Sequence, residues 1–137
     1  MVIVHSSVMI DFLAGRPNWQ TNWLTLQIGS QPVGITSLIM SEVLQGIRSE
    51  TQFAETVEAL NRFTVFETCG SELAIASAQN YRTLRGLGFT ILNTIDTFIA
   101  TFCIAAGHEL LHHDSDFEPF EKHLGLHVVH PSAVTPN

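Results

Sequence analysis

The first candidates for chemistry are two carboxylates in the opening turns of predicted helices. Asp96 lies three residues after Asn93, which is suited to cap a helix, and Glu42 lies in a helix that Thr36 or Ser37 can cap. The helix dipole favours a carboxylate in a first turn, which alone would explain Asp96. Glu42 stands beside the apolar stripe of its helix, where a carboxylate usually needs a partner or a metal ion.

Two further carboxylates, Asp114 and Asp116, follow a short apolar run that ends at Leu111. Each alone is explained by turn formation or helix capping. Together with Glu42 and Asp96, they place acids from three elements at one edge of a parallel sheet, if the apolar runs form one. Such a gathering of like charges needs a hard cation, and oxygen ligands suit Mg²⁺ or Mn²⁺. A site of this kind would activate water and stabilise charge on a phosphoryl group.

The elements that would position these acids follow from the hydrophobic pattern. Short apolar runs alternate with helical periodicity, which favours an α/β fold with a mostly parallel sheet covered on both faces. The expected strands span residues 1–4, 31–35, 63–66, 109–111 and 126–129, and the expected helices end near residues 13, 29, 47, 61, 86, 106 and 124. The tail after residue 131 is expected to fray. Ligands of such folds bind beyond the carboxyl ends of the strands, where the four acids should meet.

Composition narrows the class of protein. The 137 residues, 45% hydrophobic and 14% charged, fit a single globular domain spanning 1–137. Thirteen acidic against six basic residues give a net charge of -7, which argues against bulk electrostatic binding of nucleic acid but not against a nuclease that holds its own cation. The two cysteines, the missing signal-peptide pattern and the lack of any run of about 20 apolar residues favour a cytoplasmic protein with no membrane partner.

Four segments, taken in chain order, resemble the motifs of one family. They span residues 2–13, 35–46, 88–100 and 110–117. The ordered set is similar to PIN-domain ribonucleases, specifically the VapC toxins of VapBC toxin–antitoxin modules. The resemblance implies a three-layer α/β/α PIN-like domain with a central, mostly parallel sheet. It also implies a Mg²⁺- or Mn²⁺-dependent endoribonuclease toxin of a type II module that hydrolyses RNA phosphodiesters.

The resemblance also assigns site residues. Glu42, Asp96 and Asp114 map to catalytic residues and metal ligands, and Asp116 maps to a second acid of the last motif. The resemblance further implies a homodimer, a cognate VapB-type antitoxin, and operator DNA as a partner only through that antitoxin.

Three further residues are candidates for substrate binding. Ser6 and Thr94 match family positions whose hydroxyls or backbone groups support the site. Arg16 follows the first predicted helix close to the edge of the site, which makes it the best basic candidate for contact with RNA.

The first motif departs from the family at one position. An aspartate usually ends the first strand, and here the residue is His5. Imidazole is a poor ligand for Mg²⁺, although it suits Mn²⁺ or Zn²⁺, so we expect weakened Mg²⁺ binding and strongly reduced cleavage. Three explanations stay open: an inactivating substitution introduced or selected because an active toxin harms its host, a natural loss of activity, or the use of a different metal.

An alternative function follows from the same departure. The chain would then be a catalytically inactive PIN domain that binds antitoxin and takes part in regulation. Trp19, Trp23, Phe53 and the helix over 50–62 could form an apolar groove for an antitoxin helix, or could simply pack in the core. The sequence indicates neither the target RNA, nor the antitoxin, nor the dimer surface.

Overall fold

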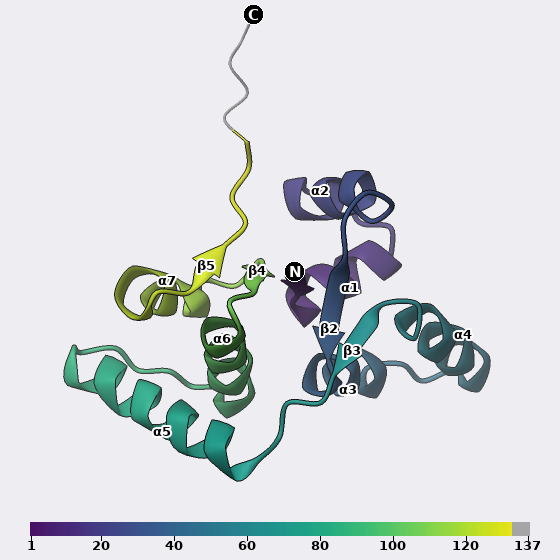
Figure 1. Cartoon of the computed structure of the whole chain (residues 1–137). Coiled ribbons are helices and arrows are strands. Elements are labelled where there is room, and N and C mark those ends of the chain that lie inside the picture. Colours follow the sequence, from purple (N-terminus) through teal and green to yellow (C-terminus); the bar gives the residue numbers. More distant parts are fainter. Residues whose placement is uncertain (133–137) are drawn as a thin grey trace, which may run out of the picture.

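The computed structural model describes residues 1–132 of the chain (Figure 1). Its strands are β1 (Val2–Val4), β2 (Val33–Thr36), β3 (Thr64–Phe66), β4 (Glu109–Leu111) and β5 (His127–Val128). Its helices are α1 (Ser6–Leu13), α2 (Trp19–Gln27), α3 (Ser37–Gln45), α4 (Glu50–Leu60), α5 (Ser71–Gly86), α6 (Thr94–Ala106), the 3₁₀ turn η1 (Ser115–Phe117) and α7 (Glu118–Leu124). The prediction that the tail frays lies largely outside the described residues.

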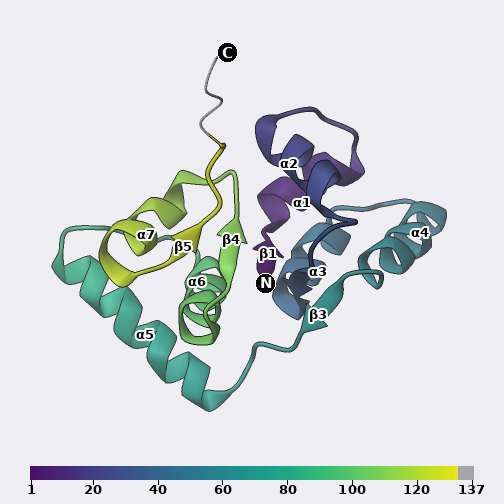
Figure 2. The ribbon, with the colours of Figure 1, turned by 45° about the horizontal axis from the view of Figure 1, so that its top comes forward.

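The five strands form one sheet in the order β3-β2-β1-β4-β5. Each neighbouring pair is parallel, so the expectation of a mostly parallel sheet is confirmed. Helices α1 to α4 gather on one side of the sheet and α5 to α7 on the other (Figures 1 and 2). The strand order reverses direction between β1 and β4, and ligands of such sheets bind beyond the strand ends at this point.

The central strand β1 is buried along its whole length, as expected for a strand covered on both faces. Close packing beside it excludes a side chain at Gly34 in β2. A Cβ atom there would lie 3.0 Å from Met1 Sδ, Phe66 Cε2 and the Thr64 carbonyl oxygen. None of the helices within residues 1–132 is long and apolar enough to cross a membrane.

Two element boundaries differ from the sequence prediction in ways that affect the site. The N-cap of α1 is His5, whose side chain accepts a hydrogen bond from the Ser7 N–H. The capping pattern pointed instead to Ser6 or Ser7, because imidazole is not among the common capping groups. The helix expected from residue 116 begins as η1, which Asp114 caps through the backbone N–H of Asp116.

Candidate active site

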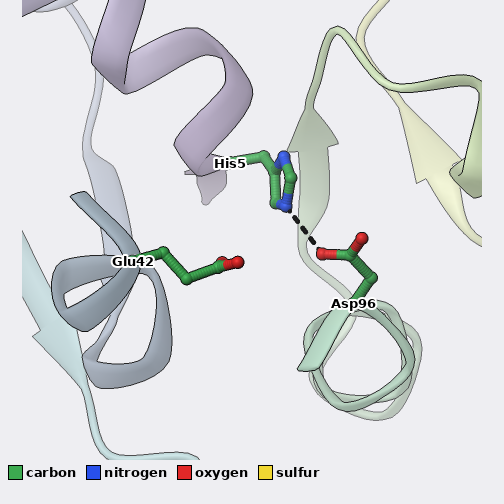
Figure 3. Close-up of side chains that lie close together, drawn as sticks. All are labelled: His5, Glu42 and Asp96. Atoms are coloured by element: carbon green, nitrogen blue, oxygen red, sulfur yellow. Dashed lines mark hydrogen bonds and ion pairs between the residues drawn. The ribbon is translucent and has the colours of Figure 1, made fainter. Parts of the chain in front are cut away.

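Three side chains from three elements converge at the carboxyl end of β1. His5 follows β1, Glu42 projects from α3, and Asp96 lies in the first turn of α6 (Figure 3). Their potential ligand atoms all lie within 4.8 Å of one another. His5 and Asp96 are only 3% and 2% exposed, so any charge on them is held away from bulk water.

Helix capping fixes the two carboxylates. Asn93 Oδ1 accepts hydrogen bonds from the backbone N–H groups of Ile95 at 2.9 Å and Asp96 at 3.4 Å. The hydroxyl of Thr36 accepts from the Ile39 N–H at 3.2 Å and begins α3, which carries Glu42. Both caps satisfy N–H groups that lack a partner within the helix. The predicted capping roles of Asn93 and Thr36 are therefore confirmed.

The hydrogen bonds around His5 fix the position of its ring proton. The Ser7 backbone N–H can only donate, and it points to Nδ1 at 3.2 Å. The Ser7 hydroxyl lies 2.8 Å from the same nitrogen and accepts from the His113 N–H at 2.9 Å, so its own hydrogen is free to donate to Nδ1. Nδ1 is therefore an acceptor, and the neutral ring carries its proton on Nε2. That N–H donates to Asp96 Oδ1 at 2.9 Å.

This tautomer decides how well His5 fits a metal ion. A ligating imidazole nitrogen needs a free lone pair, and its other nitrogen usually donates to an acceptor. Here Nε2 is occupied by a proton shared with Asp96, while Nδ1 faces donors. His5, as it is held, does not fit a divalent cation between itself, Glu42 and Asp96.

A second set of ligand atoms has a different composition. Oxygen atoms of Asp96, Asp114 and Asp116 also lie within 4.8 Å of one another, so Asp96 belongs to both sets. All donors in this second set are carboxylates, which is the chemistry that Mg²⁺ and Mn²⁺ prefer. The acids of the site therefore fit a hard cation by ligand type.

Burial and neighbouring charges together raise the pKa of Glu42. The largest effect is burial, which raises the pKa of this carboxyl above its usual range, and the charges of Asp96 and Asp114 act in the same direction. His5 and a hydrogen bond from the Ser6 hydroxyl, 3.2 Å from Glu42 Oε1, oppose the shift. The net direction is that expected of carboxylates brought together without a neutralising cation.

The other predicted substrate-binding residues lie in different surroundings. Ser6 contacts Glu42 as described. Arg16 donates to Asp11 Oδ1 at 3.2 Å and lines a groove next to Glu42. Thr94 is exposed at the start of α6, where it lines a cavity that extends to α5. Only Ser6 of these three forms a hydrogen bond to an acid of the site among the described residues.

Sequence reasoning missed Ser7, which orients His5. The signal was available: the backbone N–H groups at the start of a helix need acceptors, and His5 stands at the capping position. His112 is another histidine held in one form. Its Nδ1 accepts from the Asp114 N–H at 3.1 Å, and burial, as the main cause, lowers its pKa to about 4.

An all-parallel α/β sheet with a buried acid, Asp96, where its strand order reverses defines the class of fold, and comparison with known proteins identifies the family. The PIN domain model matches residues 2–122. The chain belongs to the PIN domain family. A comparison with curated protein sequences finds no relative at a significant level.

Solved structures place the same fold among toxin–antitoxin proteins. The VapBC2 complex of Rickettsia felis, bound to a promoter DNA fragment, matches with a TM-score of 0.75 at 18% identity, over 94% of this chain and 98% of that one. DNA-bound VapBC of Salmonella typhimurium matches with 0.73 at 17% identity, over 93% and 96%. VapC20 of Mycobacterium tuberculosis, described as a sarcin–ricin loop cleaving toxin, matches with 0.61 at 15% identity, over 86% and 93%. The sequence-based resemblance to VapC toxins is thereby supported.

Proposed function

We propose that the chain is an endoribonuclease toxin of the VapC type whose activity is impaired by His5. The observation that carries this proposal is the 2.9 Å hydrogen bond from His5 Nε2 to Asp96 Oδ1. It occupies an oxygen of the acid that belongs to both sets of potential ligands. In the family pattern an aspartate stands at position 5. Its carboxylate would add an oxygen ligand for the cation, whereas the Nε2–H of His5 competes with the cation for Asp96.

The proposed roles of the chain's own residues follow from their contacts. Asp96, Asp114 and Asp116 would hold Mg²⁺ or Mn²⁺, with Glu42 facing the same space. When bound, such a cation activates water and stabilises charge on a phosphodiester. Ser6 orients Glu42 through its 3.2 Å hydrogen bond, and Arg16 and Thr94 stay candidates for contact with RNA.

The test is RNA cleavage by the His5→Asp variant in Mg²⁺ and in Mn²⁺, compared with the unchanged chain. Mutation of a residue that orients a metal ligand lowers metal affinity or activity by about 10- to 100-fold. His5→Asp restores a ligand itself, so it should raise the rate of cleavage by about 100-fold or more. The control is the double variant His5→Asp/Asp96→Asn, which should return to background. If His5→Asp cleaves no faster than the double variant, the proposed nuclease function is wrong.

A second candidate function is an antitoxin-binding module without catalysis. A groove of about 510 Å³ between α1, α3 and α4 favours it, because Ile10 and Leu13 are 42% and 39% exposed there. An apolar helix of a partner would cover such side chains. Helix α4 contributes to this groove, as the sequence suggested, but Trp19 lines a different cavity and Trp23 packs against the core.

The partners proposed with either function are a VapB-type antitoxin, a second copy of this chain, and operator DNA reached through the antitoxin.

Co-expression with the cognate antitoxin tests the groove. An Ile10→Arg variant should lose co-purification, whereas an Ile75→Arg variant, changed at a 62% exposed residue of α5, should keep it. Retained co-purification of Ile10→Arg would exclude this groove as the antitoxin-binding surface.

A further inference from the structure

A second cavity, of about 430 Å³, opens beside the acids of the site. Its lining residues come from α2, from the segment that follows β4, and from α7. The lining residues that matter here are Trp19, Gln20, His112, Asp114, Glu118 and Glu121. Asp114 belongs both to this cavity and to the carboxylate set with Asp96. A ligand bound at those acids can therefore extend into the cavity.

One wall of the cavity carries a buried hydrogen-bond acceptor without a partner. Gln20 is 5% exposed, and its Nε2 donates to the carbonyl oxygen of His112 at 3.4 Å. Its Oε1 is buried and accepts no hydrogen bond from the described residues. Oε1 has almost no accessible surface, so a ligand in the cavity would meet the Gln20 amide through its second Nε2 hydrogen, for which the described residues offer no acceptor. The position thus favours a ligand with an acceptor atom.

The same cavity presents a donor and an aromatic surface. Because His112 Nδ1 accepts from the Asp114 N–H, the neutral ring carries its proton on Nε2, for which the described residues offer no acceptor. Trp19 is 36% exposed at the start of α2, so its indole ring is accessible for stacking. A flat ligand with acceptor atoms on its edge fits this combination.

The charges on the cavity wall exclude one class of ligand. Asp114, Glu118 and Glu121 line it, and Glu121 pairs with His130 at 2.6 Å. No lysine or arginine is among the lining residues within the part of the chain that the structure describes. A phosphate group would be repelled here, whereas an uncharged ring with amino or imino hydrogens would not.

We propose that this cavity is a nucleobase subsite, in which Trp19 stacks on one unpaired base and Gln20 and His112 bind its edge. Unpaired bases of RNA are recognised in this way, by aromatic stacking and edge hydrogen bonds. The proposal rests on the proposed function in that RNA supplies the base. It adds a specificity determinant that neither the acids nor the sequence motifs indicate.

The test uses the unchanged chain without added cation, titrated with the four ribonucleosides, with ribose 5-phosphate and with a randomised single-stranded RNA tetranucleotide. The readout is the indole N–H signal of Trp19 in NMR spectra, with Trp23, the second tryptophan, as an internal reference. We expect a saturable shift of the Trp19 signal with at least one nucleoside and none with ribose 5-phosphate. The tetranucleotide should shift the same Trp19 signal, because RNA is the proposed source of the base.

Variants separate stacking from general surface binding. Because Trp19→Ala and Trp19→Phe lack the Trp19 indole signal, their titrations are followed through the backbone N–H signals of Gln20 and His112. Trp19→Ala should weaken binding by at least about five-fold, since base stacking on an aromatic ring is worth about 1–3 kcal/mol. Trp19→Phe should retain most of the affinity. Phe53→Ala, which removes a 39% exposed aromatic ring from α4, should not change it. Trp19 and Phe53 are exposed, so these substitutions should leave the fold intact. Gln20→Leu changes a second residue of the cavity wall and should also weaken binding.

Three results would overturn the proposal: no saturable shift of Trp19, equal affinity in Trp19→Ala, or ribose 5-phosphate binding as tightly as the nucleosides. No shift of the Trp19 signal with the tetranucleotide would overturn the assignment of the base to RNA. The outcome is independent of cleavage by His5→Asp, because no cation and no reaction are involved. Failure of the subsite and failure of the nuclease function are thus distinguishable.

Discussion

His5 stabilises Asp96 at the centre of this site by donating a hydrogen bond to its carboxylate. Its Nε2–H donates to Asp96, and both side chains are almost fully buried. Hydrogen bonds to a charged, buried carboxylate are stronger than neutral ones, so this contact stabilises an acid that would otherwise be surrounded by other acids. We therefore expect that the hydrogen bond that competes with a cation for Asp96 also stabilises the folded chain.

Ser7 controls the orientation of the His5 ring, which gives a first prediction. Ser7→Ala removes the hydroxyl that bridges His5 Nδ1 and the His113 N–H, at 2.8 and 2.9 Å. We expect a loss of about 1 kcal/mol in the free energy of unfolding and a shift of the His5 Nδ1 signal in ¹⁵N spectra, because Nδ1 loses one of its two donors. The proton should stay on Nε2, since the Ser7 backbone N–H and Asp96 remain. Ser7→Thr, which keeps the hydroxyl, should retain the original Nδ1 signal. An unchanged ring spectrum in Ser7→Ala would contradict the bridging role.

His112 gives a prediction for pH. Its pKa of about 4 in the folded chain lies below its ordinary value of 6.5, so the unfolded chain binds more protons between these values. Stability from the neutral ring is present above pH 6.5 and is lost as the pH falls towards 4. His112→Asn, which keeps an acceptor for the Asp114 N–H, should show a shallower loss of unfolding free energy over this range in urea titrations. The exposed His127→Asn should keep the original slope, and equal slopes in all three chains would refute the assignment.

At the scale of elements, the start of α6 positions Asp96. Asn93 caps this helix through two backbone N–H groups, one of them that of Asp96 itself. Asn93→Ala should lower the free energy of unfolding by about 1 kcal/mol. In the His5→Asp background it should also weaken Mn²⁺ binding, because Asp96 loses its anchor.

A matched control for this cap exists in α4. Ser49 caps that helix through the Gln52 N–H at 3.2 Å, and neither residue belongs to the two sets of potential ligands. Ser49→Ala should cost a similar amount of stability and leave Mn²⁺ binding of the His5→Asp variant unchanged. Equal effects of both cap variants on Mn²⁺ affinity would show that Asn93 has no specific link to the site.

The elements were largely predictable because their signals are local. The apolar run of β1, the periodicity around Ile99 and the capping residues Asn93 and Thr36 each depend on a few neighbours in the chain. The contact of His5 with Asp96 depends on residues 91 positions apart. The tautomer of His5 depends on a third segment, at His113, which no local pattern reveals. The four acids could therefore be proposed from sequence, but their division into two sets around Asp96 could not.

At the scale of the whole molecule, the acidic charge gives a prediction about DNA. The chain has a net charge of -7, and affinity for DNA requires lysine and arginine side chains that neutralise phosphates. Alone, the chain should not bind an operator duplex at physiological salt in fluorescence anisotropy, whereas its complex with antitoxin should bind. Binding by the isolated chain in the micromolar range or tighter would contradict the proposal that DNA is reached only through the antitoxin.

The fold brings the site together at the point where the order of strands reverses, and His5 lies at the centre of that point. The central claim is that its ring proton takes the place of a cation among the acids. Calorimetric titration of Mn²⁺ into the unchanged chain and into His5→Asp tests this most directly. We expect Mn²⁺ to bind His5→Asp at least about 10-fold more tightly than the unchanged chain, because mutation of residues that only orient metal ligands already changes metal affinity by about 10- to 100-fold. Equal Mn²⁺ affinity of the two chains would contradict it.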